Sequence, residues 1–475
     1  MNRANGTGRS NGRQAEPAEH PTFVDVFAGC GGLSLGLERA GWRGLFAIEK
    51  DRFAFETLQA NFLQANSRFP YCWPDWLPQK AWGVESVLND YRAELQALRG
   101  RVDLLAGGPP CQGFSSAGRR RADDPRNAMV NYYLQLIDFL EPKFLLLENV
   151  RGIMLGFKDD RLIGHRPQIN FADELVRELS VEYDVHTTIV RASEFGVPQA
   201  RPRFILLASR RPMQIVSPLP EMLAHARSIV LSRYNLPLLT GAEDAISDFE
   251  IGRNQLVSCG DSRGFDAIGY KAPLTQFQRV MRDGFEGMPS DTRLARHTPP
   301  IRDRFADIIE LCRTEGRSTR QLSPEMRNRF GITKTATRVL DPDKPAPTIT
   351  SMPDDLLHYK EPRTLTVREN ARLQTFPDWF VFKGKYTTGG HLRRQEVPRF
   401  TQVANAVPPL LAEILGETLL TLQKAVAEHA KQSLPRRHAG PLAAQNRYPS
   451  PVPYHQRTLP SRARVKAARS NLDRD

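Results

Sequence analysis

The stretch Thr22-Phe-Val-Asp-Val-Phe-Ala-Gly-Cys-Gly-Gly-Leu-Ser-Leu-Gly-Leu-Glu-Arg-Ala-Gly41 decides the fold class. Its first part, Phe23 to Phe27, has the apolar composition of a buried strand, and Ala28 to Gly32 predicts a tight glycine turn. Leu33 to Ala40 then shows the apolar spacing of a helix. A strand, a glycine turn and a helix in this order are typical of an open α/β sheet, which binds its ligand at the carboxyl edge of the strands.

A second strand is predicted at Gly44-Leu-Phe-Ala-Ile48, and Glu49 follows it directly. The spacing from Gly29 to Glu49 is that of an acidic residue which binds ribose hydroxyls, and glycines let the backbone approach such a ligand closely. The turn fits the dinucleotide pattern G-x-G-x-x-G poorly, because the glycine that follows Gly32 is Gly36. The pattern therefore favours another adenosine cofactor, with a generic glycine turn and a solvated acid as the alternative.

A thiol is predicted at the same sheet edge by the segment Gly107-Gly-Pro-Pro-Cys-Gln-Gly-Phe-Ser-Ser116, which follows the apolar run Val102–Ala106. Cys111 in this place is a candidate nucleophile, although an isolated cysteine is more often inert packing. A further buried strand, Pro142 to Leu147, ends at Glu148. We therefore expect a carboxylate at the same sheet edge as the thiol.

The segment Phe195-Gly-Val-Pro-Gln-Ala-Arg-Pro-Arg-Phe204 precedes another apolar strand, Phe204 to Ala208. It supplies the amide of Gln199 and the guanidinium groups of Arg201 and Arg203, which suit base edges and phosphates. Alone, each of these residues is more simply a solvated surface group. Together with the thiol and the carboxylate they form an ordered set that predicts a catalytic site.

In this order the motifs resemble those of the DNA cytosine-5 methyltransferase family. The matching segments are Asp25-Val-Phe-Ala-Gly-Cys-Gly-Gly32, Glu49-Lys-Asp51, Gly108-Pro-Pro-Cys-Gln112, Glu148-Asn-Val150, Gln199-Ala-Arg-Pro-Arg203, Arg363-Thr-Leu-Thr-Val-Arg-Glu-Asn-Ala-Arg-Leu-Gln-Thr-Phe-Pro377 and Gln402-Val-Ala-Asn-Ala-Val-Pro-Pro409. The resemblance implies an α/β fold: a Rossmann-like S-adenosylmethionine-dependent methyltransferase sheet with helices on both faces, plus a smaller inserted target recognition domain.

The resemblance also implies a covalent mechanism. Carbon 5 of cytosine is a poor nucleophile, and addition of the Cys111 thiolate to carbon 6 makes the ring enamine-like, so that carbon 5 can attack a methyl group. Glu148 is the expected acid or hydrogen-bond partner at N3 and the 4-amino group. Arg203, and with it Arg201, is expected to hold the base oxygen and neighbouring phosphates.

The methyl donor that the resemblance implies is S-adenosyl-L-methionine. The residues expected to bind it are Phe27, Gly29, Gly31, Leu33, Glu49, Asn405 and Val407. Where the family usually has Gly-Asp-Ile, this chain has Asn89-Asp90-Tyr91, so Asp90 is the candidate for the adenine amino group. The alternative for Asp90 is a solvated acid after a short strand. No metal is expected, because the five cysteines show no ligand spacing.

The expected partner is double-stranded DNA, with the target cytosine flipped out of the helix. The segment Gln112 to Asn127 is predicted to be a closing loop whose glycines allow hinging and whose arginines grip phosphates. The candidate DNA-binding residues are Gln112, Ser115, Arg119, Arg126 and Gln199. The middle region offers further arginines without indicating which of them reads bases: Arg293, Arg296, Arg317, Arg320, Arg327 and Arg329.

The chain of 475 residues is predicted to have five parts. They are a disordered N-terminal tail (1–20), the first part of the catalytic domain (21–210), a target recognition domain (211–335), the return to the catalytic domain with a closing helix from Pro409 (336–428), and a basic disordered tail (429–475). Of the net charge of +13, residues 431–475 contribute +8, from ten Lys/Arg and two Asp. This charge is expected of a phosphate-binding protein, but a solvated tail without a role explains it equally well.

Two rival functions remain open: a transfer-RNA cytosine-5 methyltransferase on the same scaffold, and a non-catalytic DNA-binding regulator. We expect a monomeric cytoplasmic protein, since no apolar run reaches the roughly 20 residues that span a membrane. A restriction endonuclease that cuts the same site is a candidate partner. A solitary enzyme that marks the genome is equally consistent with the sequence.

Overall fold

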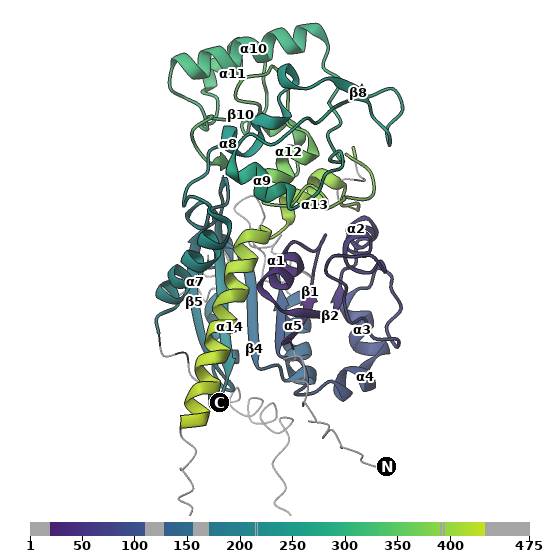
Figure 1. The fold of residues 1–475 in the computed structure, drawn as a ribbon, viewed down its shortest axis with the longest axis vertical. Helices are drawn as coiled ribbons and strands as arrows, with labels where there is room; N and C mark the ends of the chain where they lie inside the picture. Colours follow the sequence, from purple (N-terminus) through teal and green to yellow (C-terminus); the bar gives the residue numbers. More distant parts are fainter. Residues whose placement is uncertain are drawn as a thin grey trace, which may run out of the picture. The chain divides into compact units, whose positions relative to one another are not determined.

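The computed structural model has a central sheet of six strands in the order β2-β1-β3-β4-β7-β5 (Figure 1). The strands are β1 (Thr22–Val26), β2 (Arg43–Ile48), β3 (Leu104–Gly107), β4 (Phe144–Val150), β5 (Tyr183–Arg191) and β7 (Pro202–Arg210). The strands β1 to β4 are parallel to one another, whereas β7 runs antiparallel between β4 and β5. The carboxyl ends of β1 to β4 therefore lie along one edge of the sheet.

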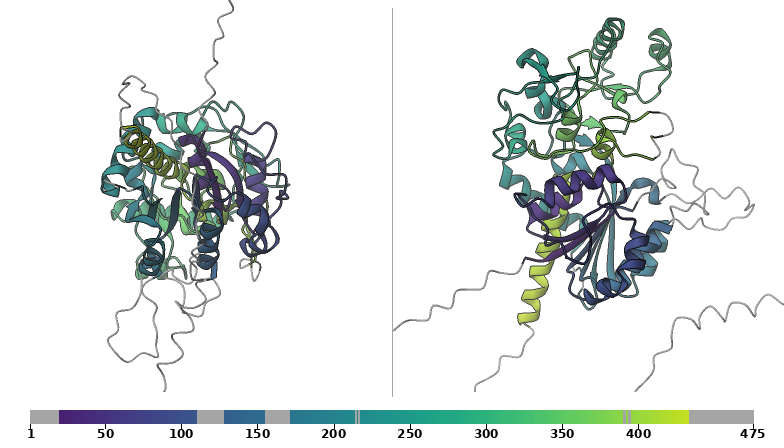
Figure 2. Two further views of the ribbon diagram at one scale, coloured as in Figure 1. Left: turned by 90° about the horizontal axis from the view of Figure 1, so that it is seen from below. Right: turned by 90° about the vertical axis from the view of Figure 1, so that its right-hand side faces the viewer.

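Helices cover both faces of this sheet, as Figure 2 shows. Alternate residues of β1 enter two separate cores: Phe23 joins one, and Val24 and Val26 join the other. The first core also takes apolar side chains from α1 (Gly32–Ala40), α2 (Arg52–Phe62), α7 (Leu219–Tyr234) and α14 (Pro409–Gln432). The second takes them from α3 (Val84–Asp90), α4 (Arg92–Ala97), α5 (Ala128–Leu140) and α6 (Phe171–Leu179). The predicted α/β class with helices on both faces is confirmed.

The predicted elements differ from the observed ones mainly at their ends. The first strand ends at Val26, and Phe27 already has a left-handed backbone (φ 61°). The strand β4 continues through Glu148 to Val150, so this carboxylate lies within the strand. The short strand that was considered before Asp90 is wrong, because residues 84–90 form the helix α3. The helix predicted from Pro409 is confirmed as α14.

The remaining chain forms shorter elements. They are η2 (Arg151–Met154), η3 (Ala192–Phe195), β6 (Gln199–Ala200), α8 (Ala242–Ile246), η4 (Ser247–Phe249), η5 (Ile251–Arg253), β8 (Leu256–Ser258), β9 (Asp266–Ile268), α9 (Gln276–Arg282), α10 (Pro299–Thr314), α11 (Pro324–Arg329), β10 (Arg338–Val339), β11 (Ala346–Pro347), η6 (Pro353–Asp355), β12 (Leu356–Leu357), α12 (Val367–Leu373) and α13 (Arg399–Asn405).

A third core lies among α10, α11, β10 and β12, where Ile308, Cys312, Met326 and Val339 are buried together. By contrast, apolar residues of α7, α8 and α9 belong to the core of the sheet. The predicted boundary at residues 210 and 211 therefore does not coincide with a change of core. The position of a recognition domain inside residues 211–335 stays a prediction.

Residues 407–416, late in the chain, pack against α1, near the beginning of the sheet. A Cβ atom on Gly32 would lie 2.4 Å from the Val407 carbonyl oxygen, and one on Gly36 would lie 2.3 Å from Ala412 Cβ. The Trp42 indole donates to the Gly416 carbonyl at 3.1 Å. These close approaches explain why α1 carries glycines on the face that meets residues 407–416.

The structure describes residues 20–109, 128–154 and 171–432, apart from 214, 216, 390, 391, 393 and 394. Met1–Ala427 forms one unit and Glu428–Asp475 a second, of which only the last turn of α14 is described. Both predicted tails lie outside the described residues, except for their innermost ends. Among the described residues one stretch, Arg399–Lys424, is long and apolar enough to cross a membrane by length and composition, but 89% of its apolar 18-residue window is buried inside the protein.

Candidate active site

The strand that leads to the thiol motif is fixed at its carboxyl end. The Asn149 side-chain amide donates to the Pro109 carbonyl at 3.0 Å. A Cβ atom on Gly108 would lie 3.5 Å from Glu148 Oε2, so the Glu148 carboxylate lies directly beside this segment. Only residue 110 separates Pro109 from Cys111 in the sequence. Cys111 itself lies outside the described residues, as do Gln112, Ser115, Arg119, Arg126 and the predicted closing loop.

Glu148 and Arg203 form an ion pair between adjacent strands. Arg203 lies on β7 opposite Val150 of β4, and its Nε is 2.6 Å from Glu148 Oε1. Both residues are buried: Arg203 is 6% exposed and Glu148 is 8% exposed. Hydrogen bonds between charged groups at such short distances are strong, and burial removes competing water. The pair therefore holds one carboxylate oxygen in place, while Oε2 faces the segment before the thiol.

Arg201 and Gln199 bind the returning chain. The Gln199 side chain is fully buried; it accepts from the Ile349 backbone at 3.0 Å and donates to Gln374 Oε1 at 2.9 Å. The Arg201 guanidinium, also buried, donates to the Ile349 carbonyl at 3.5 Å. Both side chains thus join β6 to the segment around β11. This geometry does not support the predicted DNA contact of Gln199, since its amide is already used inside the protein.

The glycine turn has the tight backbone that the sequence predicts. Gly29 and Gly31 have positive φ angles of 57° and 92°, and the Gly29 N–H donates to Glu49 Oε2 at 2.9 Å. The other oxygen of Glu49 accepts from the Asp51 N–H at 2.7 Å. Burial raises the pKa of the Glu49 carboxyl above its ordinary value. A carboxylate has about four lone-pair sites, so Glu49 keeps acceptor capacity for hydroxyl groups of a ligand.

The other predicted donor residues surround this turn to different degrees. Phe27 is partly exposed and Asn405, at the end of α13, is exposed. Leu33 and Val407 are buried in the sheet core, at 3% and 8% exposure. Their side chains therefore pack in the core behind the turn and are not exposed to a ligand.

Asp90 lies away from Glu49. It is the last residue of α3 and is exposed. The contact with Glu49 is at the other end of α3, where the Trp82 N–H, just before the helix, donates to the Glu49 carbonyl at 2.8 Å. Seven helical residues span about 10 Å. This placement argues against Asp90 as the adenine partner and puts Trp82 and Gly83 in that neighbourhood. The signal in the sequence that could have indicated this was the insertion rich in tryptophan before α3.

A second acid that sequence reasoning left without a role is Asp25, inside the first motif. It is fully buried, and the Ser34 hydroxyl donates to its Oδ2 at 2.6 Å, while its Oδ1 has no partner among the described residues. Burial is the main cause that raises the pKa of Asp25 to about 7. Its side chain lies beneath α1, so it supports the glycine turn and its helix.

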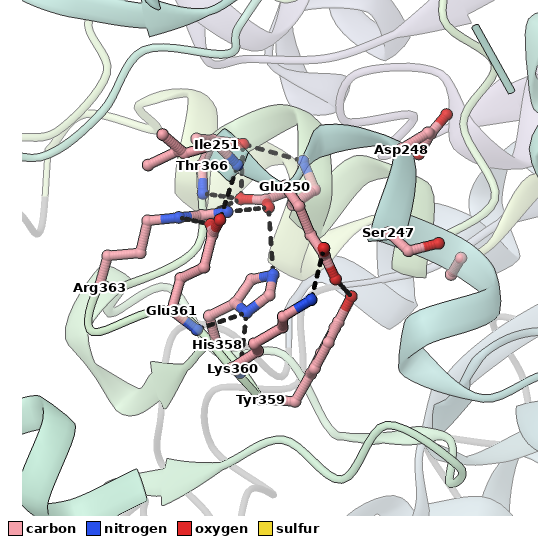
Figure 3. Close-up of polar contacts among 12 residues, drawn as sticks. Ser247, Asp248, Glu250, Ile251, His358, Tyr359, Lys360, Glu361, Arg363 and Thr366 are labelled. Carbon is pink, nitrogen blue, oxygen red and sulfur yellow. Dashed lines mark hydrogen bonds and ion pairs between the residues drawn. The ribbon is translucent and has the colours of Figure 1, made fainter. Parts of the chain in front are cut away.

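A buried polar network joins the chain before β8 to the late motif (Figure 3). Arg363 makes two hydrogen bonds to Glu369, at 2.9 and 2.8 Å, and Glu361 accepts from the Ile251 N–H at 2.7 Å. Nearby, Glu250 accepts from the Tyr359 hydroxyl at 2.7 Å. Since these carboxylates are engaged by partners within the protein, we assign the network to structure. Among the described residues no group of histidine, cysteine and acidic side chains could hold a metal ion.

The profile of the C-5 cytosine-specific DNA methylase family matches residues 21–421. The chain belongs to this family. It is a DNA (cytosine-5-)-methyltransferase, and the late motifs that close around its glycine turn fall inside the matched range.

Relatives of this methyltransferase include type II enzymes of bacteria. It is 32% identical to the type II methyltransferase M.DdeI of Desulfomicrobium norvegicum over 412 residues, which cover 84% of this chain and 88% of the relative. It is 30% identical to M1.HphI of Haemophilus parahaemolyticus, over 84% and 87% of the two chains. A crystal structure of an E. coli DNA modification methyltransferase encoded within a prophage matches with a TM-score of 0.56 and 23% identity, over 85% of this chain and 99% of that one. This last likeness concerns the fold.

Proposed function

We propose that this methyltransferase transfers a methyl group from S-adenosyl-L-methionine to carbon 5 of a flipped-out cytosine, within a specific sequence of duplex DNA, through a covalent bond between Cys111 Sγ and carbon 6. The observation that carries the proposal is the buried ion pair of Glu148 and Arg203 beside Gly108 and Pro109. It presents an oriented carboxylate next to the segment that leads to the Cys111 thiol.

The residues have separate tasks in this reaction. The Cys111 thiolate adds to carbon 6, and the Glu148 carboxyl holds the N3 and 4-amino edge and passes the proton that N3 takes up. Arg203 fixes the Glu148 carboxylate and contributes positive charge near the base. Carbon 5 would then take the methyl group that the bound donor supplies, with S-adenosylhomocysteine as the leaving group. A base removes the proton from carbon 5, the bond from Sγ to carbon 6 breaks to release the thiolate, and N3 returns its proton to Glu148.

The turn from Phe27 to Gly31 and the Glu49 carboxylate fit an adenosine-containing donor, because a close backbone approach lies beside an acceptor with spare lone pairs. When bound, the donor supplies an electrophilic methyl group. A base inside a stacked duplex cannot reach a buried carboxylate such as Glu148, and this burial supports the proposal that the cytosine is flipped out. The type II relatives favour a role beside a restriction endonuclease, in the cytoplasm.

Trapping the covalent adduct tests the mechanism. Duplex DNA with 5-fluorocytosine cannot lose a proton from carbon 5, so the enzyme should remain attached in the presence of the donor. A denaturing gel should show the adduct for the wild type and for Cys72→Ala, which removes an exposed thiol, but not for Cys111→Ala. Methylation of transfer RNA but not of DNA would favour the rival RNA enzyme. Binding of DNA without any adduct or methyl transfer would favour the non-catalytic regulator.

A further inference from the structure

A second cationic feature lies outside the candidate active site, at the hairpin of β8 and β9. We define the arginine cluster as Arg263, Arg293 and Arg296. The hairpin loop carries Arg263, and the backbone of Arg293 pairs with Ala267 of β9 as an additional antiparallel bridge. Figure 1 shows β8 on the side of the molecule that also carries α2 and α13.

Aromatic rings lie against the guanidinium groups of two of these arginines. The Arg293 guanidinium lies 4.3 Å from the centre of the Phe265 ring and 3.8 Å from that of Tyr386. Arg296 lies 4.3 Å from the Phe265 ring and donates to the Gly264 carbonyl. Stacking of a planar guanidinium leaves the N–H groups at its edge free to donate in the plane.

Two acids of this region, Asp261 and Asp291, pair with a different arginine. Arg399, the first residue of α13, pairs with Asp261 at 2.5 Å and with Asp291 at 2.9 Å. Tyr386 also donates to Asp261, at 3.0 Å. No carboxylate of the described residues lies within 4.0 Å of a nitrogen of the arginine cluster. The only side-chain hydrogen bond of Arg293 in that part of the chain goes to the Ser262 hydroxyl, at 3.3 Å.

This arrangement is costly for a structural role alone. Arg293 is half-buried, and burial lowers its pKa from the ordinary value. The charge of Asp261 acts on it only from beyond ion-pair distance and is shared with Arg399, so the buried guanidinium is incompletely compensated. A guanidinium that is oriented by two rings and lacks an acidic partner is suited to receive an anion from outside, and phosphate oxygens match its fork of donors.

We infer that the arginine cluster binds phosphate groups of the DNA backbone, as a positioning site separate from the site of Glu148 and Arg203. The inference rests on the proposed function, since it takes DNA as the partner. Phosphate contacts fix the register and orientation of a duplex and carry no sequence information. The site would therefore strengthen binding to every duplex to the same extent.

The test measures binding of the full chain to a fluorescent duplex of random sequence, by anisotropy at several salt concentrations. Arg293→Met and Arg296→Met should each weaken binding about tenfold and lower the slope of log affinity against log salt by about 1. Arg293→Lys should keep most of that slope, because the charge remains. The matched control is Arg177→Met, which removes an exposed arginine of α6 on another part of the protein.

Wild-type affinity and slope in both methionine variants would overturn the inference. If Arg293→Met does not fold, Arg263→Ser takes its place in the binding measurement, because it changes an exposed loop residue of the same cluster. Stabilisation of the wild type by inorganic phosphate alone, lost in Arg296→Met while DNA binding is unchanged, would assign the cluster to free phosphate and also overturn it. If the wild type binds no duplex at all, the proposed function itself fails.

Discussion

The Arg203 Nε lies 2.6 Å from Glu148 Oε1, across the antiparallel pair of β4 and β7. The pair orients the carboxylate that we place at the N3 edge of cytosine. Glu148→Gln keeps the shape of the side chain but cannot pass a proton, so single-turnover methyl transfer should slow by about 10²- to 10⁴-fold. Donor binding, measured by calorimetry, should stay within about twofold of the wild type. A variant with near-normal transfer rates would remove the role assigned to Glu148.

Glu49 and Asp90 should respond differently to removal of their charge. Glu49 accepts from the backbone of the glycine turn, whereas Asp90 lies exposed at the far end of α3. Glu49→Gln should weaken donor binding about tenfold, because a charged hydrogen-bond acceptor is worth about 1.5 kcal/mol or more. Asp90→Asn, the matched control, should bind the donor as the wild type does. Calorimetric titration with S-adenosylhomocysteine checks both, and a strong loss in Asp90→Asn would restore it as the adenine partner.

Gly36 is required by the packing of α1 against α14. A Cβ atom there would lie 2.4 Å from the Pro409 carbonyl oxygen and 2.5 Å from the Glu413 nitrogen, both of them backbone atoms that cannot rotate away. Gly36→Ala should therefore lower the free energy of unfolding by about 2 kcal/mol, even though alanine is the better helix former. Gly252→Ala, at a site with nothing within 4 Å, should change it by less than about 0.5 kcal/mol. Urea denaturation compares the two, and equal stabilities would contradict the packing argument.

Asp25 should make stability depend on pH. Burial raises its pKa from 3.8 to about 7 in the folded protein, so the folded state binds more protons than the unfolded state between these values. The contribution of the protonated Asp25 carboxyl to the free energy of unfolding is thus fully present below pH 3.8, and it is lost as the pH rises to 7. The side-chain amide of the variant Asp25→Asn does not titrate, so the variant should gain up to about 4 kcal/mol relative to the wild type across this window.

Denaturation of both proteins at a series of pH values measures that difference. The other buried acids are common to both proteins, so most of their contributions cancel. Glu49 is the exception, because its charge interacts with that of Asp25. The Ser34 hydroxyl can still donate to the amide oxygen of the variant, so the local packing is kept. A difference in stability that is the same at pH 4 and pH 8 would show that Asp25 stays ionised.

The local pattern of the chain predicted the catalytic sheet well. The run from Phe23 to Ala40 is apolar with the period of each element, and its glycines permit the positive φ angles that the turn adopts. The position of Glu148 is also predicted locally, because the last residues of a strand lie near the ligand edge of the sheet whatever the distant chain does. Such features depend only on residues that are close together in the sequence, so a local pattern is enough to predict them.

Other features depend on partners that are remote in the sequence. The amide of Gln199 suits a base edge and predicts a DNA contact, whereas in the structure it bonds Ile349 and Gln374. Motif spacing indicates Asp90, whereas in the structure the Trp82 N–H, before the start of α3, donates to the Glu49 carbonyl. The stacked position of Arg293 between Phe265 and Tyr386 likewise arises from three separate segments. No local pattern encodes these contacts.

The most direct measurement is bisulfite sequencing of DNA from a methylation-free host that expresses the chain, beside a host that expresses Cys111→Ala. The account predicts protected cytosines at one recurring sequence with the wild type and none with the variant. Protection that persists in Cys111→Ala, or no protected cytosine despite well-expressed wild-type protein, would contradict it.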